Sequence, residues 1–228
     1  MTRVYRLDAH PARAQTLAMA AALPAFDEPL LRQMAARGNV RTFPAHAVLI
    51  NEGDRGDSIY IVLDGRVKVY SADANGREVI YNTHGPGEYF GELSLDGGAR
   101  SASVMALTAT ACVVVPGPEV RDFIASHPDF AMHLVHKLCA LVRRASRNVR
   151  SLALEDVYGR VAGLLQELAP DHDGRRVVAE RLTQKDIANR VGASREMVSR
   201  ILTQLRVGGY IAVQARRIVL LKKLPPGW

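Results

Sequence analysis

The pattern of apolar and polar positions changes twice along this 228-residue chain. Residues 24–37 place apolar side chains at helical spacing and Gly38 follows them, which predicts one short helix. From Val40 to Val115, short apolar runs alternate with turn signals such as Asp64-Gly65, as in antiparallel strands joined by tight turns. No segment of this stretch is long enough for the crossover helix of a parallel sheet. The pattern therefore predicts an antiparallel β-barrel or β-roll.

Helical spacing returns after Pro118, with a short helix expected over 119–126 and a long one from Pro128 onward. Apolar residues along the long helix step by three and four, which is typical of a coiled-coil seam about three heptads long. We predict a dimer seam, because the helix joins two modules and is too long for one of them to bury. Packing of the helix on its own domain is the alternative. The predicted seam residues are Phe130, Leu134, Leu138, Leu141, Ala145 and Leu152.

The remaining residues predict a smaller helical unit with a hairpin. Helices are expected over 156–168, 183–190 and 194–206, with a polar loop at 170–174, strands at 211–213 and 218–221, and a basic tip at 214–217. The fold class is α+β. We divide the chain into a tail (1–20), a β-roll domain (21–127), a dimerisation helix (128–155) and a C-terminal domain (156–228).

Composition and charge support two modules. Hydrophobic residues make up 48% of the chain and charged residues 23%, which excludes wholesale disorder. Residues 1–127 carry 12 Lys and Arg against 14 Asp and Glu (net −2), whereas residues 128–228 carry 18 against 9 (net +9), so the second module is the one expected to meet a polyanion. No apolar run approaches the roughly 20 residues of a membrane span, and no signal-peptide core follows the basic N-terminus. We expect a cytoplasmic protein without a membrane partner, since two cysteines cannot build a disulfide scaffold.

Residues 182–202 have the pattern of a helix-turn-helix. Thr183 is placed to cap the first helix, Gly192 to permit the turn, and Ser194 to cap the second helix. The outward face of the second helix carries arginine, which pairs with guanine through two hydrogen bonds, and glutamate, which accepts from the cytosine amino group. A plain helical hairpin with solvated charges is the alternative. The candidate DNA-binding residues are Thr183, Gln184, Ser194, Arg195, Glu196, Ser199, Arg200, Arg216 and Arg217.

A glycine-rich segment at 90–104 carries the candidate ligand chemistry. Its glycines let the backbone approach an anion, and Arg100 offers a fork that matches phosphate. Glu92 offers a carboxylate that accepts from a sugar hydroxyl. By itself the segment also fits a surface turn.

Taken together, these motifs resemble the cyclic-AMP receptor protein/FNR family of bacterial transcription regulators over roughly residues 24–222. The resemblance rests on Gly53 and Gly65, on the string Gly91-Glu92-Leu93 followed by Arg100-Ser101-Ala102, on residues 152–160, and on the helix 194–200. It implies a cyclic-nucleotide-binding β-roll (a double-stranded β-helix or jelly roll), a dimerisation helix and a C-terminal winged helix-turn-helix.

The resemblance also implies roles for single residues in the ligand site. Arg100 and Ser101 would bind the cyclic phosphate, Glu92 would accept from the ribose 2′-hydroxyl, and the Gly91 and Leu93 backbone would line the pocket. On the long helix, Ser146 matches a base-contacting serine of the family, whereas Ala145 lacks the hydroxyl of the family's threonine. The loop from Leu93 to Arg100 is also slightly shorter than in the best-known cyclic-AMP activators.

The function implied is a homodimeric, sequence-specific DNA-binding regulator under allosteric control by a cyclic nucleotide, with cyclic AMP favoured as effector. The family suggests palindromic DNA with TGTGA-like half-sites, and contact with RNA polymerase is a family expectation. Cyclic di-GMP as effector is one alternative, and a constitutive regulator with an empty pocket is another.

Other classes lack their signatures in this sequence. No Walker loop, nucleophile elbow or HExxH motif occurs, so we expect neither an enzyme nor catalytic residues. Two cysteines cannot supply the roughly four ligands of an iron–sulfur cluster, and the intact Gly-Glu-Leu string stands where the haem-binding branch has its ligands. His133 and His136 share a helix face without a third ligand nearby, so no metal is expected and we place them at solvent or at the dimer surface. Cys139 is expected to be a packed thiol, and no covalent cofactor is expected.

Overall fold

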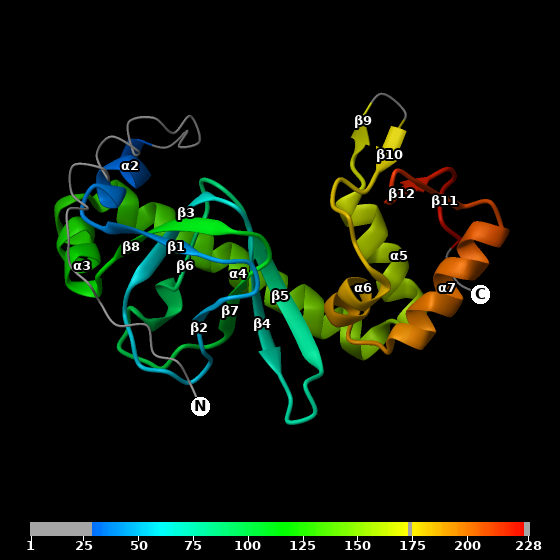
Figure 1. Cartoon of the computed structure of the whole chain (residues 1–228), viewed down its shortest axis with the longest axis horizontal. Coiled ribbons are helices and arrows are strands. Elements are labelled where there is room, and N and C mark those ends of the chain that lie inside the picture. Colours follow the sequence, from blue (N-terminus) through cyan, green and yellow to red (C-terminus); the bar gives the residue numbers. More distant parts are fainter. Residues whose placement is uncertain (1–28, 173–174, 226–228) are drawn as a thin grey trace. The chain divides into compact units, whose positions relative to one another are not determined.

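The computed structural model describes residues 29–172 and 175–225. The predicted tail at 1–20 and the start of the helix expected at 24 lie outside these residues. The described chain is α+β and forms two compact units, one of residues 29–71 and 80–135 and one of residues 72–79 and 136–225 (Figure 1). Among the described residues, none of the helices combines the length and the hydrophobicity that a bilayer span requires.

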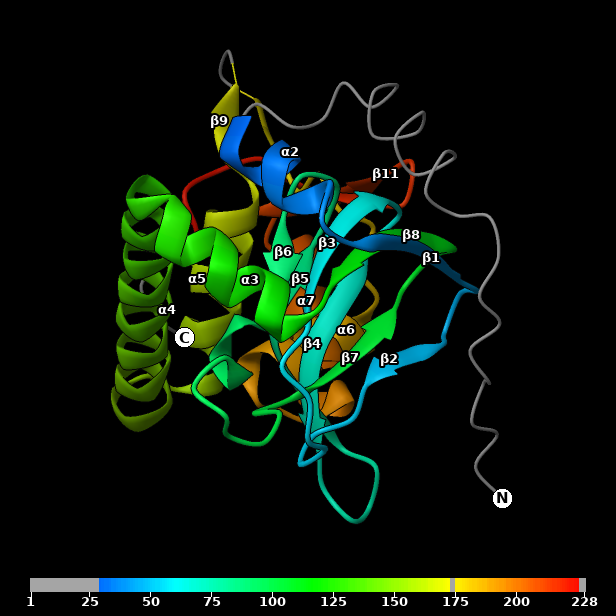
Figure 2. The ribbon, with the colours of Figure 1, turned by 90° about the vertical axis from the view of Figure 1, so that its left-hand side faces the viewer.

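Two four-stranded sheets make up the β-roll, and their strands pair antiparallel, as the turn signals predict (Figure 2). The first sheet has the order β1-β8-β3-β6 and the second β2-β7-β4-β5. The strands are β1 (Asn39–Phe43), β2 (Val48–Ile50), β3 (Ile59–Asp64), β4 (Val67–Ala72), β5 (Glu78–His84), β6 (Tyr89–Phe90), β7 (Ser103–Ala106) and β8 (Thr110–Val115).

The core of the roll lies on both sides of β3. Ile61 and Leu63 pack in one cluster with helix residues, and the alternate Val62 packs in a second cluster with Val67 and Phe90. A strand whose two faces are both buried needs apolar residues at consecutive positions, which explains the unbroken apolar run at 59–63.

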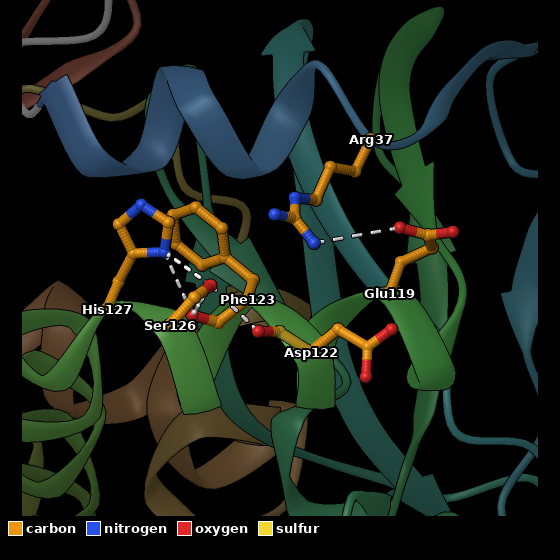
Figure 3. A network of polar contacts seen from close by, with 6 residues as sticks. All are labelled: Arg37, Glu119, Asp122, Phe123, Ser126 and His127. Atoms are coloured by element: carbon orange, nitrogen blue, oxygen red, sulfur yellow. Dashed lines mark hydrogen bonds and ion pairs between the residues drawn. The ribbon is translucent and has the colours of Figure 1, made fainter.

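The described residues of the first unit hold α2 (Pro29–Ala35), α3 (Gly117–Ser126) and the start of α4 (Pro128–Leu154). Figure 3 shows the contacts that fix α3. The Arg37 guanidinium lies 5.2 Å from the centroid of the Phe123 ring and 3.8 Å from the Glu119 carboxylate. His127 stacks on Phe123 at 4.0 Å, and its Nδ1 lies 2.9 Å from the Ser126 hydroxyl, which donates to the Asp122 carbonyl (Figure 3). These contacts secure the corner at which α3 ends and α4 begins.

The start of the predicted dimer seam needs correction. Phe130 is fully buried, against Phe123 and Tyr89 of its own unit, and Leu134 packs on the edge of the same core. A side chain without exposed area in the protomer cannot contact a partner chain. The apolar residue at position 130 is therefore explained by packing within the chain. Farther along α4 the apolar side chains open to solvent, with Val142 65% and Val149 67% exposed.

Two expectations for polar groups on α4 also change. Cys139, expected to be a packed thiol, is exposed in the protomer. His133 was placed at solvent or at the dimer surface, but it is half-buried and its ring lies 5.9 Å from both Phe130 and Tyr89. Within the described part of the chain, no three His, Cys, Asp or Glu residues gather as metal ligands would.

The second unit packs three helices on a small sheet of order β11-β12-β10-β9. The segment 170–174, expected to be a polar loop, contains the short strand β9, because its backbone pairs with β10, which in turn pairs with β12. The predicted helices and the last two strands are confirmed. The elements are α5 (Val157–Leu168), β9 (Asp171–His172), β10 (Arg175–Val177), α6 (Gln184–Val191), α7 (Arg195–Val207), β11 (Ile211–Gln214) and β12 (Arg217–Leu220).

Candidate cyclic-nucleotide and DNA sites

The glycine-rich segment follows β6 and begins with Gly91. This residue has φ of +94°, in the left-handed region that favours glycine, and a Cβ there would stand 2.7 Å from the Ser58 carbonyl and 2.9 Å from Arg100 Nη1. A short 3₁₀ helix, η1 (Glu92–Ser94), follows it. Gly91 therefore allows the backbone to approach the Arg100 guanidinium more closely than any side chain would permit.

Arg100 is buried and donates three hydrogen bonds to the walls around it. Nη1 donates to the Gly91 carbonyl at 2.9 Å and to the Ser94 hydroxyl at 2.7 Å, and Nη2 donates to the Ser58 carbonyl at 2.9 Å. The Ser94 hydroxyl in turn donates to the Gly91 carbonyl at 3.1 Å. These bonds fix the orientation of the guanidinium plane.

The same bonds leave one edge of the Arg100 fork facing Gly56. A guanidinium has five N–H donors, so the Nε–H and the second Nη2–H are the two that these contacts do not use, and they lie side by side. A Cβ at Gly56 would stand 3.4 Å from Nη2 and 3.6 Å from Nε. Because residue 56 is glycine, it places no side chain in front of this edge, whose two parallel donors match an oxyanion.

The Arg100 cation is partly desolvated, with the carboxylates of Asp57 and Glu92 near it. Burial lowers the pKa of Arg100 because it removes water from the cation, and Tyr60, Asp57 and Glu92 partly oppose that effect. Burial likewise raises the pKa of the Tyr60 phenol, so the ring beside the cation stays neutral. An anion on the open edge would compensate a cation that has lost part of its hydration.

The other predicted ligand residues differ in exposure. Glu92 is 9% exposed and Leu93 is 49% exposed, so the carboxylate side of η1 turns inward and the leucine turns outward. Ser101 is exposed next to Arg100, and Ser146 is exposed on α4 together with Ala145. Their roles toward a nucleotide remain predictions.

The helix-turn-helix has the capping chemistry that the sequence predicts. The Thr183 hydroxyl accepts from the Asp186 N–H at 3.1 Å while the Asp186 carboxylate accepts from the Thr183 N–H at 2.8 Å, which is a capping box. The Ser194 hydroxyl accepts from the Met197 N–H at 3.2 Å. Gly192 makes the turn with φ of +63°.

The base-reading candidates lie on the solvent face of α7, away from its core face. Ile201, Val198 and Leu205 are buried, whereas Arg195, Glu196 and Arg200 are exposed and Ser199 is half-exposed. This arrangement leaves the polar face of a short helix available to the major groove. Contact with DNA by these side chains remains a prediction.

The wing carries Arg216 and Arg217 at its tip. Ala215 and Arg216 form the two-residue turn between the paired residues Gln214 and Arg217, with φ of +48° and +64°. This geometry corresponds to the left-handed turn that suits the twist of a hairpin, although neither residue is glycine. The turn therefore holds the Arg216 backbone in one conformation at an exposed position.

Comparison with known proteins identifies both domains of the chain. A family model described as a cyclic nucleotide-binding domain matches residues 40–127, and one described as a Crp-like helix-turn-helix domain matches residues 159–224. A CRP-like cAMP-activated global transcriptional regulator from Mycobacterium tuberculosis is 34% identical over 183 residues, covering 78% of this chain and 82% of the relative. The chain belongs to the CRP/FNR family of transcription regulators. Its matched domains and its relatives are those of transcription regulators, not enzymes.

Solved structures of the CRP/FNR family share the fold. A transcriptional regulator from Thermus thermophilus matches with a TM-score of 0.61 at 28% identity, covering 81% of this chain and 94% of that one. The c-di-GMP responsive global regulator CLP of Xanthomonas campestris matches with a TM-score of 0.71 at 22% identity, covering 85% and 98%. The prediction of a β-roll followed by a helix and a winged helix-turn-helix is thereby confirmed.

Sequence reasoning missed the groups that orient Arg100 in this family member. Ser58 contributes a backbone carbonyl, and Gly56 matters because it has no side chain. Neither feature could be recognised from the pattern of residues in the sequence. Ser94 lies within the glycine-rich segment, where a hydroxyl three residues after Gly91 could have suggested a local hydrogen bond.

Proposed function

We propose that this chain is a homodimeric transcription regulator whose binding to specific DNA is controlled by a cyclic mononucleotide, cyclic AMP first. The observation that supports the proposal most is the Arg100 guanidinium, held by three hydrogen bonds with its remaining fork edge facing Gly56, which has no side chain. A cyclic phosphate carries one negative charge on two equivalent oxygens, and these fit a fork of two parallel N–H donors.

Other groups of the pocket would then select the nucleoside. Ser101 is exposed next to Arg100 and would add a hydroxyl to the phosphate, while Glu92 would accept from the ribose 2′-hydroxyl. The backbone at Gly91 and Leu93 would line the ribose side, and Ser146 of α4 would contact the base. Ala145 offers no hydroxyl to the base, which makes Ser146 the residue expected to contribute most to base preference.

The choice of cyclic AMP rests on the single-phosphate chemistry of the pocket and on relatives named as cAMP-activated. Cyclic di-GMP is the second candidate, because a structural neighbour at 22% identity is described as c-di-GMP responsive. A regulator that binds DNA constitutively with an empty pocket is the third reading. These effectors differ in phosphate number and base, so direct titration separates them.

The DNA target would be a palindrome, because two identical chains related by twofold symmetry read two half-sites about 34 Å apart. We propose TGTGA-like half-sites, with Arg195 and Arg200 at guanines and Glu196 accepting from a cytosine amino group on the opposite strand. Contact with RNA polymerase would follow on the bound promoter, in the cytoplasm where the chromosome lies.

The dimer seam would lie on α4 beyond Phe130. Leu134, Leu138, Leu141, Ala145 and Leu152 remain its proposed members, and Val142 and Val149 widen it with side chains exposed in the protomer. We keep the proposed division into residues 1–20, 21–127, 128–155 and 156–228.

Ligand control would act through the paired helices. A nucleotide that contacts the roll and α4 favours one arrangement of the two α4 helices, and that arrangement sets the spacing of the two α7 helices. The shift is limited to the difference in ligand affinity between the two arrangements, typically about 1–3 kcal/mol.

Calorimetric titration of the full chain with cyclic AMP, cyclic GMP and cyclic di-GMP tests the proposal. We expect saturable micromolar binding of cyclic AMP that is lost in Arg100→Leu, with the folded state of the variant checked by circular dichroism. Binding of cyclic di-GMP alone would replace the proposed ligand, and binding of none of the three would leave the constitutive regulator as the function.

A further inference from the structure

A cleft of about 220 Å³ opens between the second half of α7, the start of α6 and the wing. Its floor is apolar and its rim is polar, with two arginines from different elements. The residues that line it are Leu182, Gln184, Leu202, Thr203, Arg206, Ile211, Val213, Arg216 and Ile218. No carboxylate is among the described residues that line it.

The α7 side of the cleft continues the face proposed to read DNA. Ser199, Thr203 and Arg206 are spaced by four and three residues, so they lie in one row along the helix, one above the other. Thr203 and Arg206 are exposed, as are the base-reading candidates in the first turn of α7. A duplex whose bases meet the start of this helix therefore passes its backbone along this row.

Charge on the rim is not neutralised within the protomer. Arg206 on α7 and Arg216 at the wing tip are both exposed, and among residues 29–172 and 175–225 neither takes part in an ion pair. The Thr203 hydroxyl and the Gln184 amide add neutral donors on the remaining sides of the cleft. Two guanidinium groups and two neutral donors around an apolar floor match a phosphate with its deoxyribose.

We propose that this cleft binds a phosphate of the DNA backbone, with Arg206 and Arg216 on opposite sides of it and Leu202 and Ile218 beneath the sugar. The proposal rests on the DNA-binding function above and adds Arg206 and Thr203 to the residues assigned to DNA. Phosphate contacts fix the register and orientation of a protein on the duplex and carry no sequence information themselves. Arg206 is thus a positioning residue for the base contacts made by the first turn of α7.

The test measures the salt dependence of DNA binding by fluorescence anisotropy, with the full chain and cyclic AMP present. Two duplexes of about 30 base pairs are used, one with an inverted repeat of TGTGA half-sites and one with the same bases scrambled. Each phosphate contact contributes about −0.9 to the slope of log K against log salt. Arg206→Ala is expected to reduce the magnitude of the slope by about 0.9 for each bound half-site, and affinity about 8-fold per half-site at 0.1 M salt, by a similar factor on both duplexes.

Two further variants separate a phosphate contact from net charge. Arg206→Lys keeps the cation and is expected to retain most of the wild-type slope. Arg41→Ala removes one exposed arginine from β1 of the roll and is expected to leave both slope and affinity unchanged. An equal loss in Arg41→Ala would attribute the effect to net charge and overturn the proposed site.

The outcomes distinguish the two proposals. Wild-type affinity and slope in Arg206→Ala would overturn the phosphate site alone, as would a loss confined to the TGTGA duplex, which would make Arg206 a base reader. Equal affinity of the wild-type chain for both duplexes would overturn the proposed TGTGA half-sites, and the phosphate site would then be tested by the salt slope alone. No binding of either duplex by the wild-type chain would overturn both.

Discussion

Substitution of Gly56 by leucine gives a direct test of where the cyclic phosphate sits. A Cβ at residue 56 would be 3.4 Å from Arg100 Nη2, 3.6 Å from Nε and 3.9 Å from Cζ. Because both nitrogens are nearer than the carbon between them, that Cβ lies in front of the fork and not above its plane. A leucine side chain would therefore occupy the position of the oxyanion while leaving the three hydrogen bonds of Arg100 in place.

The expected magnitude follows from the two bonds that are blocked. A hydrogen bond to a charged group contributes about 1.5–3 kcal/mol, so the loss of two amounts to about 3–6 kcal/mol. Since about 1.4 kcal/mol corresponds to tenfold in affinity, cyclic AMP binding is expected to weaken at least about 100-fold. The fold is expected to survive, because residue 56 is exposed, its φ lies outside the left-handed region, and the added Cβ makes contacts of ordinary van der Waals length.

Gly56→Leu is a cleaner perturbation than removal of the arginine. Arg100→Leu would also leave the Ser58 carbonyl without its Arg100 donor, at a cost of about 1–3 kcal/mol, and would reduce the Gly91 carbonyl and the Ser94 hydroxyl to the hydrogen bond between them. A loss of ligand binding in that variant therefore mixes pocket chemistry with folding. The comparison of the two variants separates these effects.

The assay is calorimetric titration with cyclic AMP, with thermal unfolding of the unliganded variant as the check on folding. Gly85→Leu is the matched control, because a Cβ there would meet only the Glu88 carboxylate, at 4.0 Å, and wild-type affinity is expected. Wild-type affinity in a folded Gly56→Leu would refute the reasoning, since the phosphate would then bind elsewhere than on the open edge of Arg100.

The remaining predictions concern assembly, thiol chemistry and base reading. Val142→Glu combined with Val149→Glu is expected to give a folded monomer by sedimentation velocity, because both side chains are exposed in the protomer; a dimer of unchanged stability would place the interface elsewhere. Cys139 is expected to react rapidly with a thiol reagent at pH 8 while Cys112 reacts only after unfolding, since burial raises the pKa of Cys112 to about 12; two fast thiols in the native chain would contradict this. Arg195→Ala is expected to cost about 1–3 kcal/mol of DNA-binding free energy at one base position, measured with a panel of single-base operator variants, and a uniform loss on all sequences would indicate a backbone contact instead.

Much of the fold could be predicted from local pattern. The helix-turn-helix follows from caps and a glycine turn that act within four residues, and the structure has both caps and the turn. Short strands such as β6 (Tyr89–Phe90) and β9 (Asp171–His172) escaped prediction, because two residues carry no period. The partner of β6 is β3, about 30 residues earlier, whereas β9 pairs with the neighbouring β10.

The predicted seam on α4 shows that a correctly identified helical spacing can still be assigned to the wrong packing partner. Phe130 continues the apolar spacing of the helix, yet it is buried against Phe123 of the preceding helix. Spacing along a helix identifies a buried face but not the partner that buries it. Only tertiary packing distinguishes the first turn of α4 from the turns around Val142.

The candidate site divides in a similar way. Arg100 could be predicted as a ligand residue from the sequence, because it is the single arginine of a glycine-rich segment and can bind an anion there. Which edge of its guanidinium remains open depends on the Ser58 carbonyl, 42 residues away along the chain, and on the missing side chain of Gly56. The position of Arg206 on the same helix face as Ser199 could have been predicted from the spacing. The cleft beside Arg206 could not, because it forms only where the wing packs next to α7.

The central claim is that a cyclic nucleotide controls DNA binding, and the affinity of the wild-type chain for the TGTGA duplex with and without cyclic AMP tests it most directly. We predict that saturating cyclic AMP tightens binding to this duplex about 5- to 150-fold, the range of a coupling of about 1–3 kcal/mol, with a much smaller effect on the scrambled duplex. Equal affinity for the TGTGA duplex in the presence and absence of cyclic AMP would contradict the account, even if the chain bound both the nucleotide and the DNA.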